Sequence, residues 1–227
     1  MINRKPKEIK AVLFDMDGVL YNSMKHHADT WTDAFKQYNI EFPPEEAYLN
    51  EGRTGDATIK KAVRELANRE AKKEEIEGIY REKTARMAHV PQAHIIPGMQ
   101  ELMAKLRQSD LKIIVVTGSR QQTLLDRLNK DFGVAPEEVV SGWDVKIGKP
   151  HPEPYLIGLE KAGCTAEEAL VIENSPLGIE SAVKAGIFTI AINTGPLKNE
   201  ILTEAGAAKV VESTEEIHTL FMPGRER

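Results

Sequence analysis

The stretch that decides the fold is KAVLFDMDGVL, residues 10–20, in which a short apolar run ends in two aspartates and a glycine. Consecutive apolar residues indicate a strand covered on both faces, because a half-buried strand would alternate apolar and polar residues. Asp15 and Asp17 would then lie beyond the carboxyl end of this strand, where open α/β sheets gather their ligands. The stretch therefore predicts a buried strand with a polar site at its end.

Further runs of the same kind predict a parallel sheet. They alternate with longer segments of helical periodicity, which is the pattern of strands joined by crossover helices. Because continuous apolar strands need helices on both faces, the predicted fold class is α/β, a doubly wound, Rossmann-like parallel sheet. The runs are LKIIVVT at 111–117, ALVIEN at 169–174, IFTIAI at 187–192 and AKVV at 208–211.

The interval between residues 20 and 92 has no strand-like run, but apolar residues recur at helical spacing from Met24 to Tyr38. An interval this long usually carries structure of its own. Charges of both signs on a helical period along residues 60–83 indicate a solvated outer face. We predict an inserted small α-helical domain formed by residues 21–92. Residues 1–20 and 93–227 would together form the α/β core.

Composition limits the partners and the compartment. The 227 residues include 30 basic and 35 acidic ones, a net charge of -5, which disfavours a sequence-independent grip on nucleic acid or anionic lipid. The single cysteine, Cys164, excludes an internal disulfide and favours a reducing compartment. No apolar run reaches the ~18–20 residues of a membrane span, and MINRKPKEIK lacks the apolar segment of a signal peptide. We expect a soluble, cytoplasmic protein without nucleic-acid or membrane partners.

Acidic and amide residues follow two of the predicted strands. Asp15 and Asp17 come after the first run, and Glu173 and Asn174 close the run at 169–174. Two carboxylates so close together would repel each other unless a cation or a shared proton relieved them. Carboxylate and carbonyl oxygens are ligands that Mg²⁺ prefers, so these four residues form the predicted metal site.

The same edge of the sheet would bind an anion. Thr117 and Gly118 follow the second run, where backbone N–H groups at a helix start can hold an anion, and Lys149 adds a positive charge from the loop IGKPHP. An acidic nucleophile facing such a cradle suits phosphoryl transfer through a carboxylate. Asp15 would attack phosphorus, while Asp17 would protonate the departing alkoxide and then deprotonate the incoming water or hydroxyl.

Simpler interpretations of these residues stay open. The two aspartates and Thr117 could cap the helices that follow them, and Glu173 with Asn174 could simply begin a turn. The segment GWDVKIGK at 142–149 imitates a nucleotide-binding P-loop, but five residues rather than four separate its glycines. Pro150 also stands where a P-loop needs Ser or Thr, so we reject a P-loop.

Four segments in order resemble the motifs of the haloacid dehalogenase-like hydrolase superfamily. FDMDGVL resembles its motif I, VVTGS its motif II, GKPHPEPY its motif III and VIENSPLGIESAVKAG its motif IV. The helical interval lies where this superfamily inserts its small cap domain. The resemblance implies Asp15 as the nucleophile that forms an aspartyl phosphate, Asp17 as acid and base, and Thr117 and Lys149 as phosphate ligands. It also implies Mg²⁺ held by Asp15, the Asp17 carbonyl and the motif IV residues.

Within the superfamily the chain is similar to the β-phosphoglucomutase-like branch. That branch has a histidine and a tryptophan after motif I, here His27 and Trp31, and its histidine gates the acid/base aspartate as the cap closes. Trp31 also lies on the apolar stripe of its helix, which favours a packing role. In the segment NEGRTGDATI, Arg53 stands two places before the position of the mutase arginine, which Gly55 occupies. Asn174 replaces the usual aspartate, so the predicted metal site has one negative charge fewer.

The predicted enzyme is a Mg²⁺-dependent phosphatase of a small phosphorylated metabolite, in particular a sugar phosphate. A close alternative is a β-phosphoglucomutase that interconverts β-glucose 1-phosphate and glucose 6-phosphate. We rank the phosphatase ahead of it, because Arg53 does not stand at the position of the mutase arginine. Receiver-type signalling domains also use Asp, Thr and Lys, but they are much shorter and lack an inserted cap. A catalytically inactive binding protein conflicts with the intact pair of Asp15 and Asp17. The resemblance further implies a monomer.

Overall fold

The computed structural model describes residues 6, 8–120 and 122–221. Six parallel strands of the described chain form one sheet in the order β3-β2-β1-β4-β5-β6, which confirms the predicted fold class. The central strand β1 lies between β2 and β4, and its four residues are fully buried. The strands are β1 (Ala11–Phe14), β2 (Lys112–Val116), β3 (Val139–Val140), β4 (Ala169–Glu173), β5 (Phe188–Ile192) and β6 (Lys209–Val211).

Helices cover both faces of the sheet, as the continuous apolar runs require. Val12 and Phe14 of β1 belong to an apolar cluster with residues of α5, α6 and α10, whereas Ala11 and Leu13 belong to a second cluster with residues of α7 and α8. The helices of this part of the chain are α5 (Met99–Gln108), α6 (Gln122–Phe132), α7 (Glu153–Ala162), α8 (Pro176–Lys184), α9 (Asn199–Glu204) and α10 (Thr214–Phe221), with short 3-10 turns η1 (Pro136–Glu138) and η2 (Ala166–Glu168).

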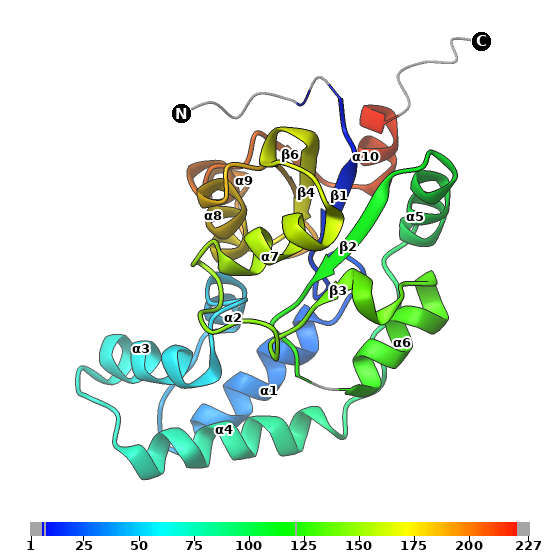
Figure 1. The fold of residues 1–227 in the computed structure, drawn as a ribbon. Helices are drawn as coiled ribbons and strands as arrows, with labels where there is room; N and C mark the ends of the chain where they lie inside the picture. The colour runs from blue at the N-terminus through cyan, green and yellow to red at the C-terminus, as the bar shows by residue number, and fades with distance from the viewer. Residues whose placement is uncertain (1–5, 7, 121, 222–227) are drawn as a thin grey trace.

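The interval between β1 and α5 is helical and lies beyond one end of the sheet (Figure 1). Its helices pack around an apolar cluster of their own, in which Trp31, Phe35 and Phe42 are buried. We call these helices with their connecting loops the cap, and we keep residues 21–92 as its proposed bounds. The helices are α1 (Met24–Lys36), α2 (Pro44–Leu49), α3 (Gly55–Ala67) and α4 (Lys73–Met87).

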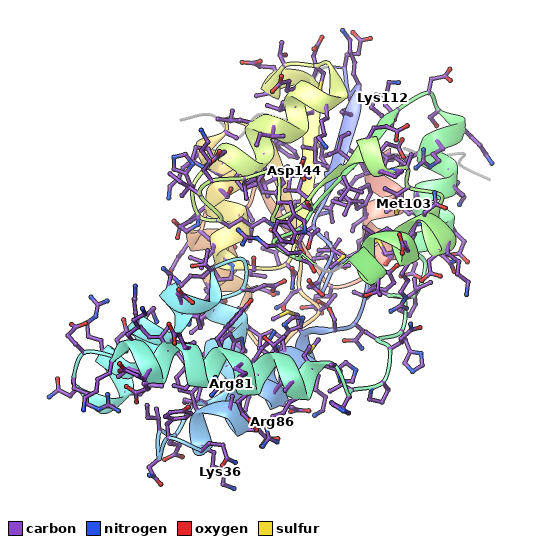
Figure 2. The ribbon with its side chains drawn as sticks, turned by 60° about the horizontal axis from the view of Figure 1, so that its bottom comes forward. Lys36, Arg81, Arg86, Met103, Lys112 and Asp144 are labelled. Atoms are coloured by element: carbon purple, nitrogen blue, oxygen red, sulfur yellow. The ribbon has the colours of Figure 1, made fainter. Side chains whose placement is uncertain are left out.

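Charged side chains cover the outer side of the cap. Figure 2 shows Lys36 and Arg86 on the side of the cap that is turned away from the sheet. Most charged residues between positions 60 and 83 are exposed, which confirms the predicted solvated face. Lys83 is one of the partly buried residues of this segment, and its side chain turns inward beside Trp31 and His27.

The sequence did not predict β3, because Val139–Val140 is too short to stand out as an apolar run. Five predicted strands are present, each within one residue or so of its expected limits. In the part of the chain that the structure describes, no helix is both long and apolar enough to cross a membrane.

Candidate active site

The polar residues that follow β1, β2 and β4 gather at one edge of the sheet. Phe14, the last residue of β1, pairs with Val115 of β2 and with Ile172 of β4, so these three strands end nearly level. The Asp15 backbone N–H continues this register by donating to the Ile172 carbonyl. Parallel strands in register therefore bring the residues after them into one place, and Asp15 lies in the middle of it.

Lys149 joins Asp15 to Glu173 in the buried floor of the site. Its ammonium donates to Asp15 Oδ1 at 2.5 Å and to Glu173 Oε1 at 2.7 Å, and the Tyr155 hydroxyl also donates to Glu173 Oε1. Burial raises the pKa of Asp15 well above its usual range, an effect that Lys149 opposes and Glu173 reinforces. Burial would lower the pKa of Lys149, but its two carboxylate partners outweigh burial and hold that pKa well above the usual range.

Glu173 has both of its carboxylate oxygens engaged by the protein. Its Oε2 accepts from the backbone N–H groups of Asn174 and Ser175 and from the Ser175 hydroxyl, while its Oε1 accepts from Lys149 and Tyr155. Ser175 is also the N-cap of α8. Glu173 therefore anchors the loop after β4 and holds Lys149, and its role as a metal ligand stays a prediction.

Asp17 lies in different surroundings from Asp15, although only one residue separates them. The Ser23 hydroxyl donates to Asp17 Oδ1 at 2.6 Å, and His27 Nε2 lies 3.6 Å from the same oxygen. Burial would raise the pKa of Asp17, but His27 and the Ser23 hydroxyl outweigh burial, so this pKa falls below its usual range. The two aspartates thus have opposite pKa shifts, because burial dominates at Asp15 whereas His27 and the Ser23 hydroxyl dominate at Asp17.

Lys83 of α4 fixes the orientation of His27. The Lys83 ammonium can donate hydrogen bonds but cannot accept them. It therefore donates to His27 Nδ1, which lies 3.3 Å from Lys83 Nζ. A neutral His27 therefore carries its proton on Nε2, the nitrogen that faces Asp17. Burial lowers the pKa of Lys83, and Asp17 partly offsets this effect.

The predicted phosphate cradle follows β2. Thr117 is buried, and its hydroxyl accepts a hydrogen bond from the Ser119 backbone N–H at 3.1 Å. A hydroxyl can accept and donate at once, so Thr117 keeps an O–H for an anion. A Cβ added to Gly118 would meet nothing within 4 Å, so the space beside this loop is open. Thr117 and Gly118 stay predicted phosphate ligands.

Trp31 and Arg53 are the two predicted cap residues that the structure does not bring to the carboxylates. Trp31 is 8% exposed and packs against Phe35 and Phe42 in the cap cluster, as its place on an apolar stripe indicates. Arg53 is half-buried, and its Nε donates to the Asn50 side chain in the same loop. Both residues therefore have local packing or hydrogen-bonding partners within the cap.

Sequence reasoning missed Glu51, a cap residue that does reach the site. Glu51 lies in the loop between α2 and α3, and its Oε2 accepts from Asn174 Nδ2 at 3.0 Å. Burial, together with the charges of Asp15 and Glu173, raises the pKa of Glu51 well above its usual range. The loop NEGRTG, residues 50–55, drew attention only through Arg53, because a lone Glu in a loop carries no distinctive pattern.

The residues present fit a hard cation such as Mg²⁺. Buried side-chain atoms without a hydrogen-bond partner in the described residues are Asp15 Oδ2, Glu51 Oε1, Asn174 Oδ1 and Arg107 Nε, and the first three belong to this site. Such unpaired buried oxygens are costly unless something neutralises them. No three His, Cys, Asp or Glu side chains of the described ranges form a metal-binding group by themselves. An ion here would need carbonyl, amide and water oxygens as well, which is the mixed set that Mg²⁺ takes.

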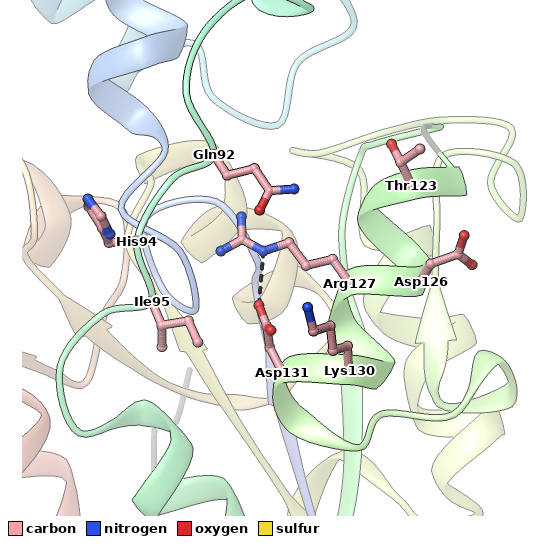
Figure 3. A pocket seen from close by; sticks show the side chains of 8 residues that line it. All are labelled: Gln92, His94, Ile95, Thr123, Asp126, Arg127, Lys130 and Asp131. Atoms are coloured by element: carbon pink, nitrogen blue, oxygen red, sulfur yellow. Dashed lines mark hydrogen bonds and ion pairs between the residues drawn. The ribbon is translucent and has the colours of Figure 1, made fainter.

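A separate pocket of about 550 Å³ lies where the chain returns from the cap (Figure 3). Figure 3 shows Arg127 of α6 bonded to Asp131, and Arg127 also donates to the Ala93 carbonyl. Its guanidinium stacks over Tyr21 at 4.0 Å. Arg127 thus fastens the returning segment to α6, and none of the residues around Asp15 lines this pocket.

The fold and the site define a capped α/β protein in which a buried aspartate, Asp15, follows the central strand. Residues 12–192 match the haloacid dehalogenase-like hydrolase family, and the chain belongs to this family. It is 30% identical over 222 residues to hexitol phosphatase A of Escherichia coli, covering 94% of this chain and 95% of that protein. It is 27% identical over 218 residues to the phosphorylated carbohydrates phosphatase of Thermotoga maritima, covering 93% and 98% of the two chains.

A solved structure is also closely similar. A Bacteroides vulgatus protein assigned as a β-phosphoglucomutase superposes with a TM-score of 0.88 at 44% identity, covering 96% of this chain and 89% of that one. The similarity extends over the sheet and the cap together. The relatives thus include both phosphatases and a protein assigned to the mutase branch.

Proposed function

We propose that this enzyme transfers the phosphoryl group of a small sugar phosphate to water through an aspartyl phosphate on Asp15. The observation that carries the proposal is the burial and the hydrogen bonding of Asp15. It is 5% exposed, bonded to Lys149 through one oxygen, and left with an unpartnered second oxygen. A buried carboxylate that is held by a lysine and keeps one oxygen for attack is suited to nucleophilic catalysis.

The first step is attack of an Asp15 carboxylate oxygen on phosphorus, which breaks the bond between phosphorus and the sugar oxygen. Asp17 gives its proton to that oxygen as the alcohol leaves. The incoming phosphate dianion favours the protonated form of Asp17, because like charges raise a carboxyl pKa. After the alcohol has left, the ionised Asp17 takes a proton from water, which attacks the aspartyl phosphate and releases inorganic phosphate and Asp15.

The charge of the phosphoryl group is balanced by groups on the floor of the site. Lys149 holds Asp15 in place and offsets its charge, and the Thr117 hydroxyl with the Gly118 N–H would bind phosphate oxygens. Asp15, the Asp17 carbonyl and Asn174 would hold Mg²⁺, which when bound would reduce the repulsion between the carboxylate and the phosphate.

The substrate class rests on the relatives. Hexitol phosphatase A and the phosphorylated carbohydrates phosphatase both act, by their names, on phosphorylated carbohydrates. A mutase is the second candidate, favoured by the 44% identity to the Bacteroides vulgatus protein. We place the phosphatase first, because Gly55 stands at the mutase arginine position and Arg53 bonds to Asn50 instead.

The test is a phosphate-release panel over hexose, pentose and nucleotide monophosphates, with and without Mg²⁺. We expect release from sugar phosphates with Mg²⁺, and a loss of more than about 10³-fold in Asp15→Asn, which lacks the nucleophile. Asp110→Asn is the matched control, because Asp110 is exposed and has a positive φ of 58° that asparagine tolerates.

Other outcomes separate the alternatives. Conversion of β-glucose 1-phosphate to glucose 6-phosphate without phosphate release would favour the mutase. A long-lived phosphoprotein without turnover would favour a signalling role. Equal, background-level release by wild type and Asp15→Asn across the panel would favour a binding protein.

The proposal also covers the oligomeric state of the enzyme and its cellular compartment. We expect a monomer in a reducing cytoplasm, since the chain has one cysteine and hence no internal disulfide. Light scattering coupled to size-exclusion chromatography, in which a single species of about 25 kDa is expected, checks the monomer.

A further inference from the structure

The loop between α2 and α3 carries a carboxylate into the floor of the site. Glu51 Oε2 accepts from Asn174 Nδ2, and its Oε1 is buried without a partner in the described residues. The next residue, Gly52, has a φ of +82°, and a Cβ there would lie 2.9 Å from Lys149 Cδ. The loop therefore presses against the lysine that holds Asp15, and a side chain at position 52 would push it away.

Asn174 is fixed between this loop and the end of β1. It is 7% exposed, and a Cβ at Gly18 would lie 2.0 Å from its Nδ2. The amide nitrogen of Asn174 donates to Glu51, which leaves Asn174 Oδ1 without a hydrogen-bond partner in the described residues. Glu51 thereby decides which end of the amide is presented to the site.

The charges around this pair call for a divalent cation. Lys149 offsets one of the two buried carboxylates that it bonds, those of Asp15 and Glu173. An ionised Glu51 brings the floor of the site to a formal charge of minus two, while its side chain has, among the described residues, a hydrogen bond only to the neutral amide of Asn174. Burying such a charge for stability alone would be costly.

We propose that Glu51 and Asn174 act together as one divided carboxylate, in which Asn174 supplies the oxygen ligand and Glu51 supplies the negative charge. Glu51 is then a positioning residue that acts on the cation through Asn174. A cation bound against Asp15 and Asn174 ties the cap loop to the core, so cation binding and the closed position of the loop stabilise each other. This inference rests on the proposed function in that the cation is the Mg²⁺ of that reaction.

The variant Glu51→Gln separates this role from simple packing. Its side-chain carbonyl can still accept from Asn174 Nδ2 in a side chain of nearly the same volume, so a merely structural Glu51 would be replaced without consequence. What the variant removes is the charge. The swap variant Glu51→Gln/Asn174→Asp returns that charge to the other member of the pair, and its glutamine amide can donate to the carboxylate introduced at position 174.

The experiment is calorimetric titration of the full chain with Mg²⁺ in the absence of substrate. We expect Glu51→Gln to weaken Mg²⁺ binding by about 10–100-fold, the usual effect of losing a group that supports a metal ligand. The swap variant should recover most of that affinity. Glu45→Gln, which removes an exposed charge from α2 of the same cap, should bind Mg²⁺ as the wild type does.

A second readout follows the loop itself. Trypsin cleaves after arginine, and Arg53 lies two residues beyond Glu51. Mg²⁺ should slow cleavage at Arg53 in the wild type and in the swap variant, and should not slow it in Glu51→Gln. Equal protection in all variants would show that the cation holds the loop without the charge of Glu51, and no protection in any variant would show that it does not hold the loop; either result would overturn the coupling.

The titration distinguishes failure of this inference from failure of the proposed function. If Glu51→Gln binds Mg²⁺ within about twofold of the wild type, or if the swap restores nothing, the divided carboxylate is wrong whatever the enzyme hydrolyses. If the variants behave as expected but no phosphate is released from any substrate, the proposed phosphatase is wrong and the cation site stands. If the wild type binds no Mg²⁺, both are wrong.

Discussion

The two halves of the candidate site differ in how their side chains reach it. In the core half, the polar residues directly follow buried strands or lie in the loop that packs on them. In the cap half, they come from separate helices and a loop, which the apolar cluster around Trp31 and Phe35 holds together. The core half consists of Asp15, Thr117, Lys149, Glu173 and Asn174, and the cap half of His27, Glu51 and Lys83.

This difference teaches that the chemistry and its control have separate structural origins. Asp15, the proposed nucleophile, is fixed by the register of β1 with β2 and β4. The groups that contact Asp17 and Asn174 from the cap depend on how the cap sits on the core. A change in the core half should therefore affect both stability and rate, whereas a change in the cap half should mainly affect pH dependence, cation binding or substrate affinity.

The largest effect is expected for Lys149→Met. This change leaves Asp15 and Glu173 buried without their cation, so phosphate release should fall by at least about 10²-fold and the free energy of unfolding by about 3–5 kcal/mol. Urea unfolding and the release assay measure the two effects. Lys146→Met, at an exposed position of the same loop, should change the free energy of unfolding by less than about 0.5 kcal/mol. If the Lys149→Met variant were stable and active, the expected difference between substitutions in the core half and in the cap half would be wrong.

A smaller effect is expected for Ser23→Ala, just before α1 of the cap. The Ser23 hydroxyl donates to Asp17 Oδ1, and a hydrogen bond to the charged form lowers a carboxyl pKa. Its loss should raise the pKa of Asp17 back toward the usual range. The acid limb of the pH–rate profile should move to higher pH, because Asp17 must be ionised to take a proton from water. Ser109→Ala, at an exposed site on the far side of the core, should leave the limb in place.

The smallest effect is expected for Arg53→Ala. Its Nε bonds to Asn50 within the same loop, so kcat should change by less than about twofold. Steady-state kinetics on the best substrate of the panel measures kcat and KM separately. A tenfold rise in KM at unchanged kcat would show that Arg53 binds the substrate, and the cap half would then contribute an anion contact of its own.

The sequence predicted the core half because local pattern and position coincide there. Asp15 follows a run of four apolar residues. A strand that is apolar on both faces is expected in the middle of a sheet that helices cover on both sides. Glu173 and Asn174 were found in the same way, although the pattern could not show that Glu173 would have both oxygens engaged.

In the cap half, the family resemblance pointed to His27, whereas Lys83 and Glu51 escaped prediction for a physical reason. Lys83 stands in a charged helical segment whose other residues are mostly solvated, and only the packing of α4 on α1 turns it toward His27. Glu51 lies in a loop whose path depends on contacts with Gly52, Lys149 and Asn174 from distant parts of the chain. Contacts of that kind leave no periodic trace in the sequence.

The most direct measurement is chemical trapping of the phosphorylated enzyme. After brief reaction with a sugar phosphate and Mg²⁺, borohydride reduces an aspartyl phosphate to homoserine, which mass spectrometry locates in the digested chain. We expect homoserine at position 15 in the wild type and none in Asp15→Asn. Turnover of the substrate with no modification at position 15, or with modification at another residue, would contradict the account.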